Sequence, residues 1–172
     1  MKKLLAMLLC AALFALPRAM ADASDDMDDM IRDAMEVYAW FTICPLDVNT
    51  DAAPTEDGRY PVFDDILALP QNLQARLDQY FSEDIARSLW EWDAYEPVNG
   101  WLYGFPPTGS LLARPIDPTI AGFSCEVTED TGTRRVCEVS VSYFFSEQPE
   151  TFESVCEYQE EHWVFTEFRF FW

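Results

Sequence analysis

The stretch FSCEVTEDTGTRRVCEVSVSYFF, residues 123–145, predicts an antiparallel β-hairpin. Apolar and polar residues alternate from Phe123 to Thr128, and the alternation resumes from Cys137 to Phe145. Between the two runs, Asp130-Thr131-Gly132 is suited to a three-residue loop, because its glycine accepts left-handed backbone. The stretch therefore predicts two paired strands, at about 123–128 and 133–145.

The chain closes with EEHWVFTEFRFFW, residues 160–172, which predicts the last strand of the same sheet. Trp163 and Phe165 share one face of such a strand, and strict alternation would put Phe168 on the other face. A bulge near Thr166 would return Phe168 to the first face. With a further strand at about 152–158, these segments predict a curved antiparallel sheet in which the closing strand is a core element.

The N-terminus, MKKLLAMLLCAALFALPRAMA, has the three parts of a secretory signal peptide. Lys2 and Lys3 form a positive start, an apolar run too short to span a bilayer follows, and Ala19-Met20-Ala21 has the form of a cleavage site. We expect cleavage after Ala21, a single domain over residues 22–172, and a periplasmic or secreted location. No membrane insertion is expected once the signal peptide is removed.

Cleavage would remove Cys10 and leave Cys44, Cys125, Cys137 and Cys156. An even number of cysteines in an exported chain is typical of two disulfides. Three pairings are possible, and a loop centred on Thr131 favours one of them, because it places Cys125 directly opposite Cys137. The remaining pair would then be Cys44 with Cys156. The chain has no C-x-x-C motif, so no metal site is predicted at these cysteines.

The charge of the chain restricts its partners. Asp and Glu number 31 against 11 Lys and Arg, for a formal net charge of −20, and every basic residue after the predicted cleavage site is an arginine. A basic face is the mark of nucleic-acid binding and of anionic membranes, so neither partner is expected. The charge favours a basic protein partner with salt-sensitive association, although acidity also serves solubility alone.

Helical segments precede the strands. Apolar residues recur at helical spacing after the capping residues 24–26, and Pro45 ends this first segment. A second segment follows Pro70, and Ser82 is placed to cap a third. The apolar positions are Met27, Met30, Ile31, Ala34, Met35, Tyr38 and Phe41 in the first segment, Leu73, Leu77, Tyr80 and Phe81 in the second, and Ile85, Leu89 and Trp92 in the third.

The loop between the first two helical segments contains a partial calcium-loop pattern. Asp47, Asn49 and Asp51 have the required spacing, but Ala52 replaces the glycine of the turn and Gly58 replaces the bidentate glutamate. Both features are needed for a calcium site. The loop is therefore predicted to be a turn stabilised by Asp and Asn side chains, without metal.

Residues 96–122 hold five prolines and four glycines, and predict an irregular segment with a small turn at Asn99-Gly100. Aromatic residues gather in and just before this segment. Exposed aromatics on a rigid scaffold form binding sites, whereas buried ones would fold the segment over the sheet. Burial is the favoured alternative, because large aromatics dominate core area, and binding is the other one. The candidate binding residues are Trp92, Tyr95, Trp101, Tyr103 and Phe105.

Helices followed by a curved antiparallel sheet indicate an α+β fold. The segments DAMEVYAWF, LDQYFSEDIARSL and HWVFTEFRF resemble the NTF2-like superfamily, and within it a group of secreted bacterial domains of unknown function. In the last segment, Trp163, Phe165 and Phe168 match the spacing common in the closing strand of that superfamily. The resemblance implies a cone-shaped sheet wrapped round the N-terminal helices, often enclosing a pocket.

The sequence contains no catalytic motif that outweighs a structural explanation. The single histidine, His162, stands beside Glu160 and Glu161 at a predicted strand start, where a surface position is the simpler interpretation. We therefore predict no catalytic residues and no cofactor, and lean against an enzyme. The first prediction is a binding protein, such as an inhibitor or immunity-type protein for a basic partner. The alternative is a pocket for a small apolar ligand, and the superfamily also contains isomerases and dehydratases.

Overall fold

The computed structural model describes residues 27–107, 120–143 and 148–168. These residues form an α+β fold of three helices and two antiparallel sheets. The helices are an N-terminal helix over 27–42, α2 (Pro70–Asp78) and α3 (Glu83–Trp90). The predicted cleavage site, the capping residues 24–26 and the end of the closing stretch at 169–172 lie outside the described residues.

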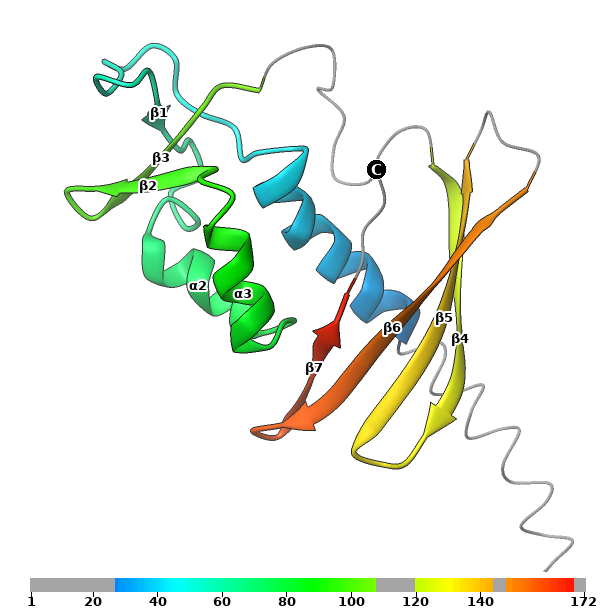
Figure 1. Cartoon of the computed structure of the whole chain (residues 1–172). Coiled ribbons are helices and arrows are strands. Elements are labelled where there is room, and N and C mark those ends of the chain that lie inside the picture. Colours follow the sequence, from blue (N-terminus) through cyan, green and yellow to red (C-terminus); the bar gives the residue numbers. More distant parts are fainter. Residues whose placement is uncertain (1–26, 108–119, 144–147, 169–172) are drawn as a thin grey trace, which may run out of the picture.

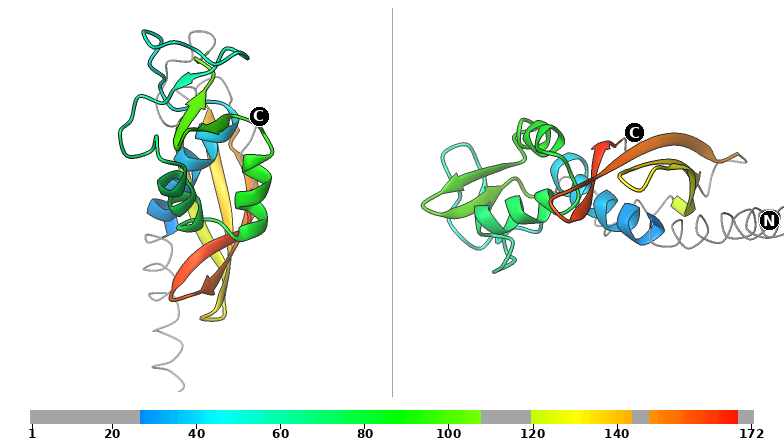
Figure 2. Two further views of the ribbon diagram at one scale, coloured as in Figure 1. Left: turned by 90° about the vertical axis from the view of Figure 1, so that its left-hand side faces the viewer. Right: turned by 90° about the horizontal axis from the view of Figure 1, so that it is seen from below.

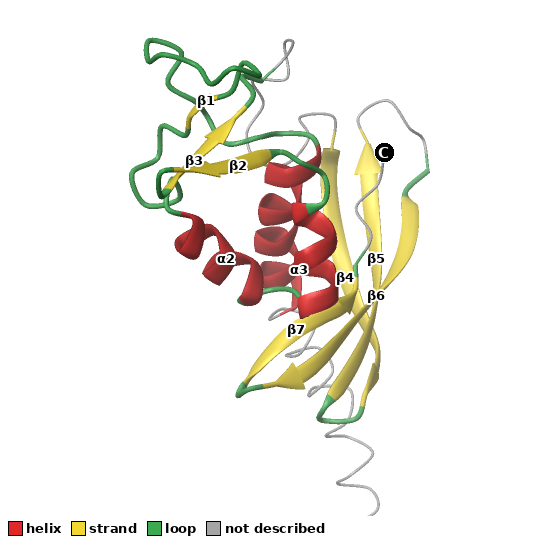
Figure 3. Cartoon of the chain, turned by 60° about the vertical axis from the view of Figure 1, so that its left-hand side comes forward, coloured by secondary structure: helices red, strands yellow, loops and turns green. Residues whose placement is uncertain are grey.

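The two sheets differ in size. The small sheet has the order β1-β3-β2, with β1 (Tyr60–Pro61), β2 (Tyr95–Val98) and β3 (Trp101–Gly104). The large sheet has the order β4-β5-β6-β7, with β4 (Ile120–Asp130), β5 (Arg134–Tyr143), β6 (Glu150–Gln159) and β7 (His162–Glu167). The helices lie between the two sheets (Figure 3).

The N-terminal helix runs along the concave side of the large sheet (Figures 1 and 2). Its predicted apolar face is confirmed, since Met27, Ile31, Met35 and Phe41 are buried in the same core cluster as side chains of β4 to β7. Tyr38 contacts the rings of Phe81 and Phe168, with centroids 6.2 and 5.6 Å away. Apolar burial of this kind is the main stabilising term for an amphipathic helix.

The bulge predicted near Thr166 is confirmed. Val155 pairs with Glu167 and Cys156 pairs with Phe165, so Thr166 is the extra residue of β7. As a result Phe165 and Phe168 are both buried, with ring centroids 4.8 Å apart. The closing strand is therefore a core element, as expected.

The free side of β7 is joined to the segment between α2 and α3. Phe165 N donates to Tyr80 O at 2.7 Å, and Ser82 N donates to Phe165 O at 2.9 Å. Ser82 is the N-cap residue of α3, as predicted, although its side chain makes no capping hydrogen bond. These two bonds fix the helices against the sheet at the end of β7.

The hairpin of β4 and β5 forms as predicted, but its register differs from the prediction. Cys125 pairs with Val139, and Cys137 pairs with Val127. The turn is tighter and lies later in the chain than expected, because Thr131 N donates to Arg134 O at 3.0 Å and only two residues lie between them. A bulge between Val127 and Glu129 then moves the register back by one residue. The register moves by two residues, so Cys125 and Cys137 keep the same face but are diagonal neighbours rather than opposite ones.

The segment predicted to be irregular contains β2 and β3. The predicted turn at Asn99-Gly100 is confirmed, with φ values of 52° and 86°, and it connects these two strands. The prolines do not interrupt the ladder because Pro97 belongs to β2, a strand at the edge of the small sheet. Part of the Pro-rich segment, residues 108–119, lies outside the described residues.

The predicted face of the third helical segment needs one correction. Helix α3 ends at Trp90, so Trp92 lies beyond the helix and is exposed, while Leu89 is buried. Trp90 takes the place expected of Trp92, with its ring 5.2 Å from that of Phe41. No helix of the described residues has the length and apolar character needed to cross a membrane.

Candidate functional sites

The outer face of the small sheet carries exposed aromatic residues. Alternation along β3 buries Leu102 and Gly104 and turns Trp101 and Tyr103 the other way. Residues paired across strands share a face, so Val98 lies beside Trp101, and Glu96 and Pro61 lie beside Tyr103. We call these side chains, together with Phe105 just after β3, the outer face.

The five predicted aromatic residues have different positions. Trp92, Trp101 and Phe105 are 61%, 47% and 41% exposed, while Tyr103 is half-buried. Tyr95 is buried and structural: its hydroxyl donates to Trp40 O at 2.8 Å and accepts from Leu46 N at 2.7 Å. Burial raises the pKa of Tyr95, consistent with a hydroxyl that stays protonated. The structure thus keeps Trp101, Tyr103 and Phe105 at one candidate site and removes Tyr95 from it.

Arg59 was missed by sequence reasoning, and it organises the base of this face. Its side chain is only 5% exposed, and it pairs with Asp57 and Asp93 at 2.7 Å each. It also donates to Asp93 O at 2.9 Å, and its guanidinium lies 4.5 Å from the ring centroid of Phe105. The sequence feature that could have pointed to Arg59 is that it is a single arginine within an acidic stretch.

The surface around Arg59 carries a net negative charge. Burial lowers the pKa of Arg59, but its hydrogen bonds to Asp57 and Asp93 outweigh burial and raise the pKa. The hydrogen bond from Thr55, followed by that from Arg59, lowers the pKa of Asp57. Residues 47–66 and 91–105 contain nine acidic residues and one basic residue, Arg59, which already has its partners. The surroundings of the outer face are therefore strongly negative.

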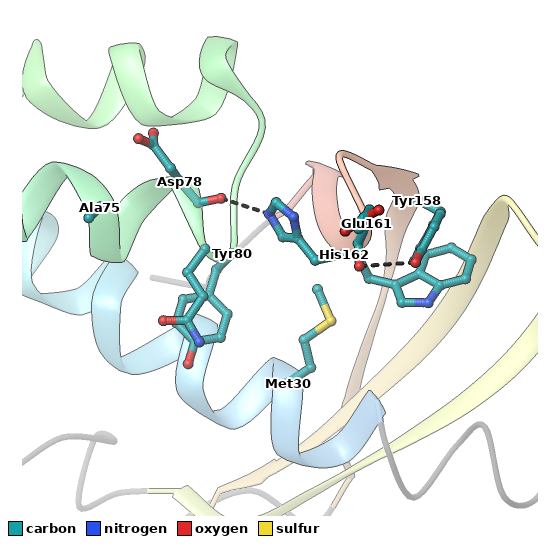
Figure 4. Close-up of a pocket in the computed structure, with 9 residues that line it drawn as sticks. Met30, Ala75, Asp78, Tyr80, Tyr158, Glu161 and His162 are labelled. Carbon is teal, nitrogen blue, oxygen red and sulfur yellow. Dashed lines mark hydrogen bonds between the residues drawn. The ribbon is translucent and has the colours of Figure 1, made fainter.

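A cavity of about 670 Å³ opens between the N-terminal helix, the end of α2 and the turn from β6 to β7 (Figure 4). Its lining combines aromatic, apolar and acidic side chains. Tyr80 Oη donates to Asp33 Oδ2 at 2.8 Å, and burial, followed by this bond, raises the pKa of Tyr80 to about 12. The lining residues are Met30, Ala75, Asp78, Gln79, Tyr80, Tyr158, Glu161, His162 and Trp163.

His162 is exposed at the start of β7, as predicted. Its two ring nitrogens lie 3.2 Å from Asp78 O and 3.3 Å from Glu160 O. Both nitrogens thus face main-chain carbonyl oxygens. This geometry gives the ring a positioning role between the end of α2 and the turn, and we assign no proton transfer to it.

The turn beside His162 has an uncommon backbone. Glu160 and Glu161 both have positive φ, 48° and 70°, without being glycine. Tyr158 Oη donates to Glu161 O at 3.0 Å, and the ring of Tyr158 lies edge-on to the ring of Trp163. The Arg135 guanidinium also lies over the ring of Trp163. These contacts hold the strained turn at the rim of the cavity.

The cysteine pairing expected from the sequence is not formed. Among the described residues, Cys44, Cys125, Cys137 and Cys156 form no disulfide in this structure. Cys125 and Cys137 are diagonal because of the register described above. Cys44 follows the N-terminal helix near Tyr95, whereas Cys156 contacts Cys137 within the large sheet. The predicted link from Cys44 to Cys156 is likewise not seen in this structure.

Within the described residues, no cluster of His, Cys, Asp and Glu is arranged to hold a metal ion. The calcium-like loop is explained by its own hydrogen bonds, since Asn49 Oδ1 accepts from Asp51 N at 3.1 Å. A second hollow, of about 570 Å³, lies between α3 and strands β6 and β7 and is lined by Glu153, Glu167 and mainly uncharged side chains. It brings together no additional reactive group.

Comparison of the sequence with models of known protein families found no matching family, and comparison with curated proteins found no match. The function therefore has to be argued from the two candidate sites themselves.

Proposed function

We propose that this protein is an exported acidic binding protein whose outer face, on the small sheet, docks a basic protein. The observation that carries the proposal is the exposure of Trp101 and Phe105 within an acidic surface whose one arginine, Arg59, is already paired. Exposed tryptophan on a rigid element supplies apolar contact energy, and the surrounding carboxylates attract and orient a cationic partner.

The rigidity of the hairpin supports this role. Strands β2 and β3 are joined by a two-residue turn, Tyr95 ties β2 to the end of the N-terminal helix, and Arg59 ties the base of the sheet to Asp93. A preorganised surface loses little conformational entropy on binding, so a small apolar patch gives useful affinity. An inhibitor or an immunity-type protein against a basic enzyme or toxin has this chemistry.

The test starts with a basic protein captured from the native envelope or culture supernatant at low salt and released at high salt. The purified pair is then measured with two variants of equal exposure, Trp101→Ala in the outer face and Tyr158→Ala at the cavity, both 47% exposed. Trp101→Ala is expected to weaken binding by more than about 1 kcal/mol, and Tyr158→Ala by less than half of that. Equal affinities for both variants and the parent protein would remove the outer face as the docking site.

The second candidate is a small-molecule site, favoured by the cavity next to His162. Its volume of about 670 Å³ lies within the usual range for ligand pockets, and Trp163, Tyr80 and Met30 offer apolar contact. Native mass spectrometry of protein purified from its host would show a co-purifying mass that Tyr158→Ala reduces and Trp101→Ala leaves unchanged. That pattern would favour the cavity over the outer face.

We also propose that the fold is NTF2-like and that residues 1–21 direct export. The curvature of the large sheet around the N-terminal helix and the bulge at Thr166 support the first proposal (Figure 2). The charged start, apolar run and Ala19-Met20-Ala21 site support the second. N-terminal sequencing of the protein from the host envelope is expected to begin at Asp22, and a start at Met1 would overturn the export proposal.

A further inference from the structure

Three of the four described cysteines lie on one face of the large sheet, in three neighbouring strands. Cys137 in β5 is opposite Val127 in β4 and opposite Ser154 in β6. Cys125 is two residues from Val127, and Cys156 is two residues from Ser154, so all three side chains share the face that packs on the N-terminal helix. Each flanking cysteine is therefore a diagonal neighbour of Cys137.

The two diagonals run in opposite directions along β5. Cys125 is opposite Val139, two residues after Cys137, whereas Cys156 is opposite Arg135, two residues before it. The three cysteines consequently form a straight row across the sheet with Cys137 at its centre. A thiolate that attacks a disulfide sulfur must approach in line with the departing sulfur, and this row supplies that alignment on both sides of Cys137.

The side chains are in contact, and Cys137 differs from its neighbours. Hydrogen bonds from the Cys125 and Cys156 thiols lower the pKa of Cys137, and the nearby Arg135 guanidinium lowers it further. The same contacts raise the pKa values of Cys125 and Cys156. The negative charge of a thiolate in this row is therefore best accommodated at the central sulfur.

Ser154, directly opposite Cys137, gives an independent indication. Its side chain is fully buried, and its hydroxyl has no hydrogen-bond partner among the described residues. A buried hydroxyl without a partner costs free energy unless it serves another group. Placed beside Cys137, this hydroxyl is available to donate to the central sulfur when it is a thiolate.

Exposure differs along the row. Cys137 and Cys156 are 0% exposed, whereas Cys125 is 8% exposed and lies in β4, one of the two edge strands of the large sheet. Diagonal neighbours in a sheet lie about 7–8 Å apart, which is at or beyond the Cα separation that a disulfide spans, so a bridge there requires the strands to move together. A bridge at either diagonal is thus expected to be reducible and able to exchange, and an oxidant reaches the row first at Cys125.

We propose that Cys125, Cys137 and Cys156 form a thiol–disulfide exchange relay that accepts an external disulfide at Cys125 and moves the bridge inward to Cys137 and Cys156. The external oxidant is a low-molecular-mass disulfide such as glutathione disulfide. This activity is independent of partner docking at the outer face, and it replaces the static pairing expected from the sequence.

The steps balance in atoms and electrons. Cys125 sulfur attacks one sulfur of the external disulfide, its proton passes to Cys137, and the first external thiolate leaves and is protonated by solvent. Cys137 then loses its proton to solvent and attacks Cys125 sulfur, which forms the Cys125–Cys137 bond and releases the second external thiolate. Solvent protonates this thiolate as well. The two cysteines are oxidised by two electrons, and the external disulfide is reduced to two thiols. Cys156 then attacks Cys137 sulfur, and Cys125 leaves and takes the proton of Cys156, with no further change in oxidation state.

The experiment follows the bridges in time. Reduced, purified protein is mixed with glutathione disulfide, quenched with acid at intervals, and cleaved after glutamate, which separates the three cysteines because Glu126, Glu138 and Glu153 lie between them. Mass spectrometry of the parent protein is expected to show a glutathione adduct on Cys125 first, then the 125–137 bridge, and finally the 137–156 bridge. A single bridge that never changes, a bridge containing Cys44, or no bridge at all would overturn the relay.

Variants separate relay from simple oxidation. Cys156→Ala should stop at the 125–137 bridge, and Cys125→Ala should slow formation of the 137–156 bridge at least tenfold, while Cys44→Ala should leave every rate unchanged. Ser154→Ala should slow bridge transfer and shift its pH profile upward, because the donor to the Cys137 thiolate is lost. Circular dichroism confirms that each variant is folded, and the time course of the parent protein decides the matter if a variant is not. Equal rates in Cys125→Ala and the parent protein would contradict entry at Cys125.

Discussion

The two sheets of this protein use aromatic residues in opposite ways. In the large sheet, β4, β5 and β6 are ten or eleven residues long, and Phe165 of the six-residue β7 is completely buried on the face that packs on the core. In the small sheet, strands of four residues bury Tyr95 and Leu102 on the inner face and leave Trp101 exposed on the outer one. Each sheet packs one face on the core. The outer face of the small sheet carries the exposed aromatics of the proposed docking site, whereas the inner face of the large sheet supplies most of the buried strand residues of the core.

The largest difference is expected from truncating a core aromatic. Phe165→Ala should lower the free energy of unfolding by about 3–5 kcal/mol, because Phe165 is fully buried against Phe81 and Phe168. Trp101→Ala should change it by less than about 0.5 kcal/mol, since the side chain is half in solvent. Urea unfolding followed by circular dichroism measures both, and similar losses would mean that Trp101 is also a core residue.

Removing one hydroxyl tests the inner face of the small sheet. Tyr95→Phe should cost about 1–3 kcal/mol, because the buried Leu46 N–H loses its acceptor and Trp40 O loses its donor. Tyr103→Phe is the matched control on the outer face, and it should cost less than about 0.5 kcal/mol. Denaturant unfolding compares the two, and a neutral Tyr95→Phe would show that the hydroxyl does not tie β2 to the N-terminal helix.

Glycine exchange compares one tight turn of each sheet in which the backbone is left-handed. Gly100→Ala in the small sheet should cost about 1 kcal/mol, since its φ is 86° and no steric contact is involved. Glu161→Gly, at the cavity, should stabilise by about 0.5 kcal/mol, because it relieves a non-glycine residue at φ 70°. Thermal unfolding measures the change in stability, and its sign, for both variants. A destabilising Glu161→Gly would mean that the Glu161 side chain contributes more than the backbone strain costs.

The smallest expected effect is the pH dependence of the Arg59 cluster. The pKa of Asp57 is lower in the folded protein than in the unfolded chain. The ionised carboxylate therefore stabilises the fold at pH values above the unfolded pKa, and this stabilisation is lost as the pH falls through the folded pKa. The pH range in which this stability is lost therefore lies below about pH 4, which is the ordinary pKa of aspartate. In Arg59→Ala the loss of stability between pH 4 and pH 2 should be shallower than in the parent protein, as followed by unfolding monitored through tryptophan fluorescence. An unchanged slope would show that the Arg59 pair does not couple folding to Asp57.

Much of the large sheet follows from local patterns. Alternation from Phe123 to Phe145 predicted the hairpin, and the broken alternation of Trp163, Phe165 and Phe168 predicted the bulge at Thr166, because a buried face requires a consistent parity. The first helix followed from apolar spacing in the same way. These features depend on residues close in sequence, so composition and order are sufficient to specify them.

The sites depend on distant residues. The position of the turn at residues 132–133 and the bulge between Val127 and Glu129 together set the register that places Cys125, Cys137 and Cys156 in one row. The pairing of Arg59 with Asp93 joins residues 34 positions apart. Alternation specifies which face of the sheet a side chain occupies. It does not specify which residue of the neighbouring strand lies opposite, because a register shift of two residues leaves every side chain on the same face. The sequence by itself determined the charge, the elements and their buried faces. Only the tertiary structure decided which aromatics are exposed and which cysteines meet, because packing and register, rather than local propensity, select among long-range contacts of similar energy.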